Sequence, residues 1–183
     1  MKTPFSLHRL ALTFASAVLV STLPCAHAGT TVLDVELGVT THDQVRSALI
    51  KKTKVTEGTS YYMKGPRLST DGSSYGIDGL NSVQYAFDTD KRLAVVSMLM
   101  QKARFNDVFE LLNAKYGLVS KTIPTVGDRY ATFLGQDSVI TIVADHLEFE
   151  MQVRYMRNDY YTTMLAKDRE EEQSKHKREK SKF

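Results

Sequence analysis

Residues 83–100 read VQYAFDTDKRLAVVSMLM, and this stretch decides the fold class. Val83, Tyr85 and Phe87 alternate with small or polar residues, which is the period-two pattern of a half-buried strand. The residues at 88–91 are typical of a turn. The run from Leu93 to Met100 is apolar on both faces, as in a central strand. Together these features predict an antiparallel hairpin at the centre of a sheet.

More strands are predicted on both sides of this hairpin. Residues 31–37 form a short leading strand or extended arm in this prediction, and further strands fall at 53–57, 118–123, 129–134, 138–144 and 147–156. The last of these alternates most strictly: one face carries Leu147, Phe149, Met151, Val153 and Tyr155. The other face carries Glu148, Glu150, Gln152 and Arg154. This pattern is typical of an antiparallel sheet with one wet face.

Two helices are expected to pack on the sheet. At 42–51, Val45 and Leu49 fall on one face, and Thr40 or Thr41 with Asp43 or Gln44 makes a capping-box pattern at the start. At 104–116 the apolar stripe is Phe105, Val108, Phe109, Leu112 and Tyr116. Gly117 then ends the helix.

The expected fold is therefore a single α+β domain at 29–160, with two helices packed on an antiparallel sheet of about seven strands. The order of elements in the two halves is similar: 47–57 parallels 110–121, and 85–99 parallels 131–144. Two tandem α-β-β-β units, the second with an added strand, explain this similarity. A single sheet whose hairpins merely look alike explains it as well, so both interpretations stay open.

A Gly-rich segment at 58–80 interrupts the pattern, and five of the ten glycines lie there. It predicts a long loop or a ragged hairpin. Tyr61, Tyr62, Met63 and Tyr75 are its large side chains, and exposed Tyr and Met are typical of contact surfaces. They are the candidate partner-binding residues. The alternative is that they fold down on the core as a lid.

The two ends of the chain differ from this body. Residues 1–28 carry Lys2 and Arg9, a short apolar run and a final Ala26-His27-Ala28, the pattern of a cleaved secretory signal peptide. Cys25, the only cysteine, lies in this leader after Pro24, which favours a soluble form over a lipid-anchored one. No membrane span is expected after cleavage. Residues 161–183 predict a charged tail, either a frayed helix or disordered.

Charge and composition argue against several classes of function. The chain has a net charge of +3, and much of the positive charge belongs to the leader and the tail, so nucleic-acid binding is not expected. The basic tail predicts at most weak electrostatic contact with anionic surfaces. His42 and His146 have no metal-ligand spacing, and no nucleophile motif or phosphate-binding glycine pattern is found. We expect no catalytic site, no metal and no cofactor.

The segment from Gly38 to Val45 (GVTTHDQV), followed by Leu49, resembles the G-x-T-x-x-x-V-x-x-x-L opening of small exported bacterial proteins. These include the outer-membrane-assembly lipoprotein BamE and the beta-lactamase-inhibitor-like fold. The resemblance implies short helices with antiparallel sheet, sometimes as tandem units, and action by protein binding. The chain departs from the pattern at Ile50-Lys51-Lys52, where Gly-x-Pro is usual, and no partner or site residue is carried over.

The expected function is that of an exported, non-catalytic envelope protein, periplasmic or secreted, that binds a protein or another envelope component. One alternative is a small-molecule binder that uses the 58–80 loop as a lid. Another is an envelope hydrolase that uses the paired carboxylates Glu148 and Glu150, which point to the same face of the predicted strand.

Overall fold

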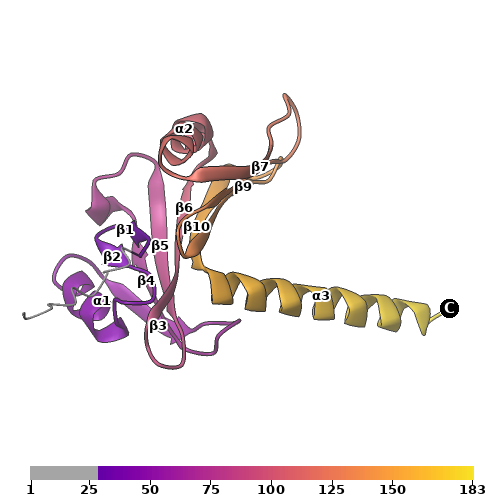
Figure 1. The fold of residues 1–183 in the computed structure, drawn as a ribbon, viewed down its shortest axis with the longest axis horizontal. Coiled ribbons are helices and arrows are strands. Elements are labelled where there is room, and N and C mark those ends of the chain that lie inside the picture. The colour runs from indigo at the N-terminus through magenta and orange to yellow at the C-terminus, as the bar shows by residue number, and fades with distance from the viewer. Residues whose placement is uncertain (1–28) are drawn as a thin grey trace, which may run out of the picture.

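The computed structural model describes residues 29–183, which form an α+β fold around a large antiparallel sheet (Figure 1). The sheet has eight strands in the order β3-β4-β5-β6-β10-β9-β8-β7, and β1 and β2 form a separate pair. The strands are β1 (Thr31–Val32), β2 (Val35–Glu36), β3 (Val55–Thr59), β4 (Pro66–Asp71), β5 (Leu80–Phe87), β6 (Leu93–Gln101), β7 (Gly117–Thr122), β8 (Arg129–Leu134), β9 (Ser138–Ala144) and β10 (Glu150–Arg157). The helices are α1 (His42–Leu49), α2 (Phe105–Lys115) and α3 (Asn158–Lys180), with short 3₁₀ turns η1 (Ser73–Tyr75) and η2 (Lys102–Arg104). The predicted leader at 1–28 lies outside the described residues.

The fold has two halves, and each consists of a helix followed by a four-stranded meander. Helix α1 precedes β3 to β6, and α2 precedes β7 to β10. The halves join where β6 pairs with β10, which sets Met98 opposite Val153 and Val96 opposite Tyr155. All four of these side chains are buried. The first half therefore has four strands where three were expected, and the second half has the expected added strand.

Helices α1 and α2 cover one face of the sheet, where the main core lies. Val45 and Leu49 of α1 and Phe109 and Leu112 of α2 are buried there, and the ring of Phe109 lies 5.7 Å from that of Phe133 on β8. Burying each such side chain contributes roughly 1.5–3 kcal/mol. The predicted capping box is confirmed at Thr41, whose N–H donates to Gln44 Oε1 at 2.8 Å.

Two predicted segments, the extended arm at 31–37 and the loop or ragged hairpin at 58–80, are corrected. The arm at 31–37 is a tight hairpin, because Leu33 and Asp34 have φ of +50° and +63° and reverse the chain. The glycine-rich segment at 58–80 contains a real strand, β4, in which only Leu68 and Thr70 point into the core. An eighth strand therefore joins the sheet where a loop or ragged hairpin was expected.

The C-terminal segments also differ from the prediction. Strand β10 begins at Glu150, so that Leu147 and Phe149 lie in a turn and are 86% and 91% exposed. The charged tail forms the third helix, α3, which projects away from the sheet (Figure 1). Only its first turns pack on the body, through the buried side chains of Tyr160 and Met164.

An ion-pair network fixes the base of α3. The Arg157 guanidinium donates to Asp88 Oδ2 at 2.8 Å and to both carboxylate oxygens of Asp159 at 2.6 Å. Hydrogen bonds from Arg157 hold the pKa of the Asp159 carboxyl below its usual value. The network joins the turn after β5 to the first turn of α3.

Candidate functional site

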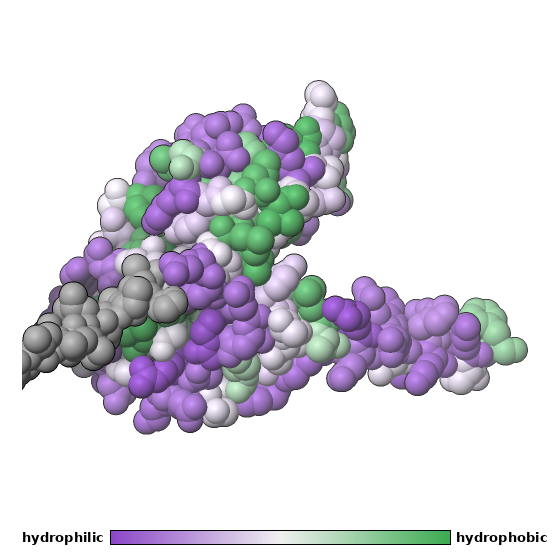
Figure 2. All heavy atoms as spheres, viewed as in Figure 1, coloured by the Kyte–Doolittle hydropathy of each residue, from purple (hydrophilic) through white to green (hydrophobic). Residues whose placement is uncertain are grey.

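The second face of the sheet is covered only in part. Helix α3 leaves it at one end, and the β7–β8 hairpin projects from the other (Figure 1). Figure 2 shows a hollow between these two projections, with apolar residues on one side and the polar surface of α3 on the other. We call this hollow the notch.

Strand register places side chains of different kind in parallel rows on the floor of the notch. One row is polar, with each residue directly paired to the next: Ser69, Gln84, Ser97, Arg154, Thr141 and Thr132. The next row begins with Arg67 and continues with Ala86, Val95, Met156, Val139 and Leu134. A chain lying across the strands would therefore meet a polar track beside an apolar one.

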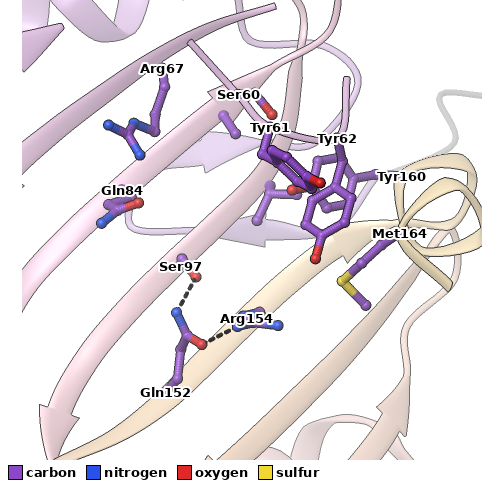
Figure 3. A pocket seen from close by; sticks show the side chains of 12 residues that line it. Ser60, Tyr61, Tyr62, Arg67, Gln84, Ser97, Gln152, Arg154, Tyr160 and Met164 are labelled. Carbon is purple, nitrogen blue, oxygen red and sulfur yellow. Dashed lines mark hydrogen bonds between the residues drawn. The ribbon is translucent and has the colours of Figure 1, made fainter. Parts of the chain in front are cut away.

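A recess of about 170 Å³ opens where α3 meets this floor (Figure 3). Tyr62 and Tyr160 form its wall, with their rings 5.7 Å apart in an edge-to-face arrangement. Gln152 lies on its floor and donates to Ser97 Oγ at 3.3 Å. The side chains come from the β3–β4 turn, four adjacent strands and α3.

The β3–β4 turn is fastened to α3 by its tyrosines. The Tyr62 hydroxyl donates to Asp168 Oδ1 at 3.0 Å, and the Tyr61 hydroxyl donates to Glu171. Lys167 Nζ donates to the Tyr62 carbonyl at 2.7 Å. Burial, together with the Asp168 hydrogen bond, raises the pKa of Tyr62 to about 12, so its phenol stays protonated at neutral pH. The predicted residues Tyr61 and Tyr62 thus line the recess, and Tyr62 and Met63 pack against the small core cluster that includes Met164.

Two arginines line the recess without a charge partner. Within residues 29–183, no carboxylate lies within 4 Å of Arg67 or Arg154. Arg154 donates to Gln152 Oε1, and Arg67 Nε is buried without a hydrogen-bond acceptor. Sequence analysis placed Arg154 on the polar face of its strand, but nothing in the sequence shows that a strand cation lacks a partner.

The other side of the notch is apolar and exposed. Tyr130, Leu134 and Val143 project from the open face of β8 and β9, with 45%, 52% and 37% of their surface exposed. We call these three residues the apolar patch. Loops at the adjoining end of the sheet add Val126 and Phe149. Tyr130 and Val143 are directly paired, and Leu134 lies on the same face beyond the Thr132–Thr141 pair. Several large apolar side chains exposed on one face are typical of an interaction site.

Tyr75, the fourth predicted partner-binding residue, lies apart from the other three. It packs against the main core, and its hydroxyl is 2.9 Å from that of Tyr85. A second recess, of about 250 Å³, lies there beneath α1, between Leu49 and the Leu33–Asp34 turn. The structure therefore divides the predicted set between the two faces of the sheet.

The carboxylates considered for hydrolysis do not converge on a cavity. Glu148 is exposed in the turn before β10, and Glu150 accepts a hydrogen bond from Asn81. Neither lines the recess beneath Tyr62 or the one beneath α1. Across residues 29–183, no cluster of three His, Cys, Asp or Glu side chains is arranged to hold a metal ion. None of the described helices has the length and apolar character that crossing a membrane requires.

No protein-family model, curated protein or solved structure matches the chain.

Proposed function

We propose that this chain is an exported, non-catalytic binding protein of the cell envelope, periplasmic or secreted, and that it holds a protein partner in the notch. The observation that carries the proposal is the exposed apolar patch on β8 and β9. These three large side chains are exposed to water on a sheet face. They therefore lack the stabilising free energy that apolar side chains gain when they are buried. A partner that covers them recovers that free energy.

The two best-enclosed hollows of the described residues are small, which favours a protein over a small molecule as the occupant; the larger hollows, of about 820, 410 and 310 Å³, are more open to solvent. Pockets for drug-sized ligands usually measure about 300–1,000 Å³. The recess beneath Tyr62 has about 170 Å³, and the one beneath α1 about 250 Å³. Each accommodates a side chain more readily than a whole metabolite. The β3–β4 turn then serves as a wall of a protein-binding surface instead of a lid over a small ligand.

The proposed surface keeps three of the predicted partner-binding residues. Tyr61 is 57% exposed at the entrance to the recess, while Tyr62 and Met63 support the wall behind it. Tyr75 is left out, because it lies on the covered face. The apolar patch takes its place as the main contact area.

Capture from an envelope fraction, followed by a binding measurement with the purified partner, tests the proposal. The informative variant combines Tyr130→Thr with Leu134→Thr, since threonine suits exposed strand positions. Leu111→Gln is the matched control, because Leu111 is 69% exposed on α2, outside the notch. Loss of a contact residue at an interface hot spot costs more than about 1 kcal/mol, so the double variant should bind at least about tenfold more weakly. Equal binding by all three proteins would exclude the notch as the binding surface.

A further inference from the structure

We infer that the recess beneath Tyr62 and Tyr160 receives carboxylate groups of the protein partner, with Arg154 and Arg67 as its two cationic anchors. The inference rests on the proposed function, since it assigns the chemistry of the partner group that enters the notch. It concerns a site separate from the apolar patch, and its test can fail while the patch still binds.

The electrostatic argument begins with Arg154. It lies in the middle of the sheet, directly opposite Ser97, on a floor that Tyr160 and Met164 partly cover. Its charge acts on both wall tyrosines: burial raises the pKa of Tyr160, and the Arg154 charge opposes that rise. A guanidinium has five N–H donors, and Gln152 is the acceptor that the described residues supply. The remaining donors are free for an incoming anion.

Arg67 supplies the second anchor. Gly58 lies directly opposite it on edge strand β3, and a Cβ atom there would come within 3.0 Å of Arg67 Nη2. The glycine thus leaves room for the guanidinium to lie over the edge strand. The buried Nε–H has no hydrogen-bond acceptor among the described residues. Unsatisfied buried donors are costly, and a ligand oxygen would satisfy them.

The acidic residues nearest the recess are already engaged elsewhere. Asp168 accepts from Tyr62, and Glu171 accepts from Tyr61. Both carboxylates therefore hold the wall in place and leave the arginine charges uncompensated. An incoming acidic group meets positive charge at the floor and aromatic edges at the side.

Dimensions indicate how the acidic groups are spaced. Arg67 is on β4 and Arg154 on β10, three strand spacings apart across the sheet and two residues apart along the strands, or about 16 Å at the level of the backbone. Four residues of extended chain rise about 13 Å. A strand-like partner segment that crosses the sheet diagonally, with acidic residues at positions i and i+4, therefore brings both carboxylates within side-chain reach of the two anchors. The volume of the recess equals that of about five or six liquid water molecules, which suits a carboxylate side chain.

A peptide titration followed by NMR tests the inference without the natural partner. The probe is acetyl-Glu-Gly-Ser-Gly-Glu-amide at low salt, and the matched peptide has glutamine in place of both glutamates. We expect shifts in the amide signals of β4, β6 and β10 with the glutamate peptide. Arg154→Gln and Arg67→Gln should each weaken binding by about tenfold, since a hydrogen bond to a charged group has that effect or more. Lys51→Gln, which removes the same charge from the far side of the molecule, should bind as the unmodified protein does.

Each contrary result overturns the inference in a recognisable way. Equal binding of the glutamine peptide would show that the recess does not recognise a carboxylate. Unchanged affinity of both arginine variants would show that Arg154 and Arg67 are not the anchors. Inorganic sulfate forms a third arm: if it binds as tightly as the glutamate peptide, the recess takes free oxyanions and the assignment to a protein partner is wrong. If a partner captured through the apolar patch binds both arginine variants normally, the inference fails while the proposed function stands.

Stability supplies a second readout. An arginine kept for binding, without a partner in the free protein, contributes little to folding. We therefore expect Arg67→Gln to melt at the same temperature as the unmodified protein or higher. A clear fall in melting temperature would make Arg67 a structural residue and overturn its role as an anchor.

Discussion

Replacing Arg157 with glutamine is expected to lower the free energy of unfolding by about 2 kcal/mol. Arg157 and Asp88 have side chains only 20% and 14% exposed, whereas Asp159 is 54% exposed. Water can replace the contacts to Asp159, so those contribute little. The contact with Asp88 is shielded, and a shielded hydrogen bond between charged groups contributes about 1.5–3 kcal/mol.

Urea denaturation and thermal melting measure this effect. A loss of about 2 kcal/mol lowers the melting temperature of a domain this size by about 4–8 °C. Arg46→Gln is the control, because the Arg46–Glu57 pair is exposed on both sides and its loss should not measurably change stability. Arg157→Lys should fall between the two, since lysine cannot reproduce the forked geometry. If Arg157→Gln unfolds like the control, the network does not anchor α3 and the reasoning is refuted.

Three further outcomes are expected. Gly65→Ala should destabilise the protein by about 1–3 kcal/mol, because its Cβ would come within 2.2 Å of the Asp88 carbonyl oxygen; Gly117→Ala, whose nearest neighbour is 3.9 Å away, should change denaturation far less. Tyr62 has a folded-state pKa raised to about 12, so its stabilising contribution is complete below the unfolded value of about 10 and is lost as pH rises through 12; absorbance titration of Tyr62→Phe should lack this late phenol, and an unchanged curve would contradict the assignment. Ending the chain after Glu172 should leave the melting temperature unchanged, because the later residues of α3 are exposed, and a large fall in melting temperature would show that they support the fold.

Much of the fold could be predicted from the sequence, because burial on one face of a strand leaves a period-two pattern. β8 and β9 begin and end where alternation predicted, and the hairpin at 83–100 is correctly placed. β4 was missed because only two of its side chains, Leu68 and Thr70, are buried, and they lie among glycine, proline and polar residues that hide the alternation. α3 was predicted as a charged tail, either a frayed helix or disordered, since its apolar contacts end near Leu165 and give no stripe.

The candidate site was harder to predict, because it depends on which strands become neighbours. The tyrosines at 61 and 62 stood out by composition, and they lie beside the recess. Tyr75 lies in the same glycine-rich segment, but its side chain is on the other face of the sheet. The path of the chain through η1 places it there, and the sequence alone does not show that path. The pairing of β6 with β10 brings Ser97 beside Arg154, and no local pattern in either strand specifies that pairing.

The junction of the two meanders has a consequence for any occupant of the recess. Residues from both halves of the sheet line it, so neither half alone could assemble it. A ligand bound there would contact both halves of the sheet at once. By linkage, its binding free energy would oppose the separation of the two halves. Occupancy would thereby raise the cooperativity of the whole molecule and slow the separation of its two halves.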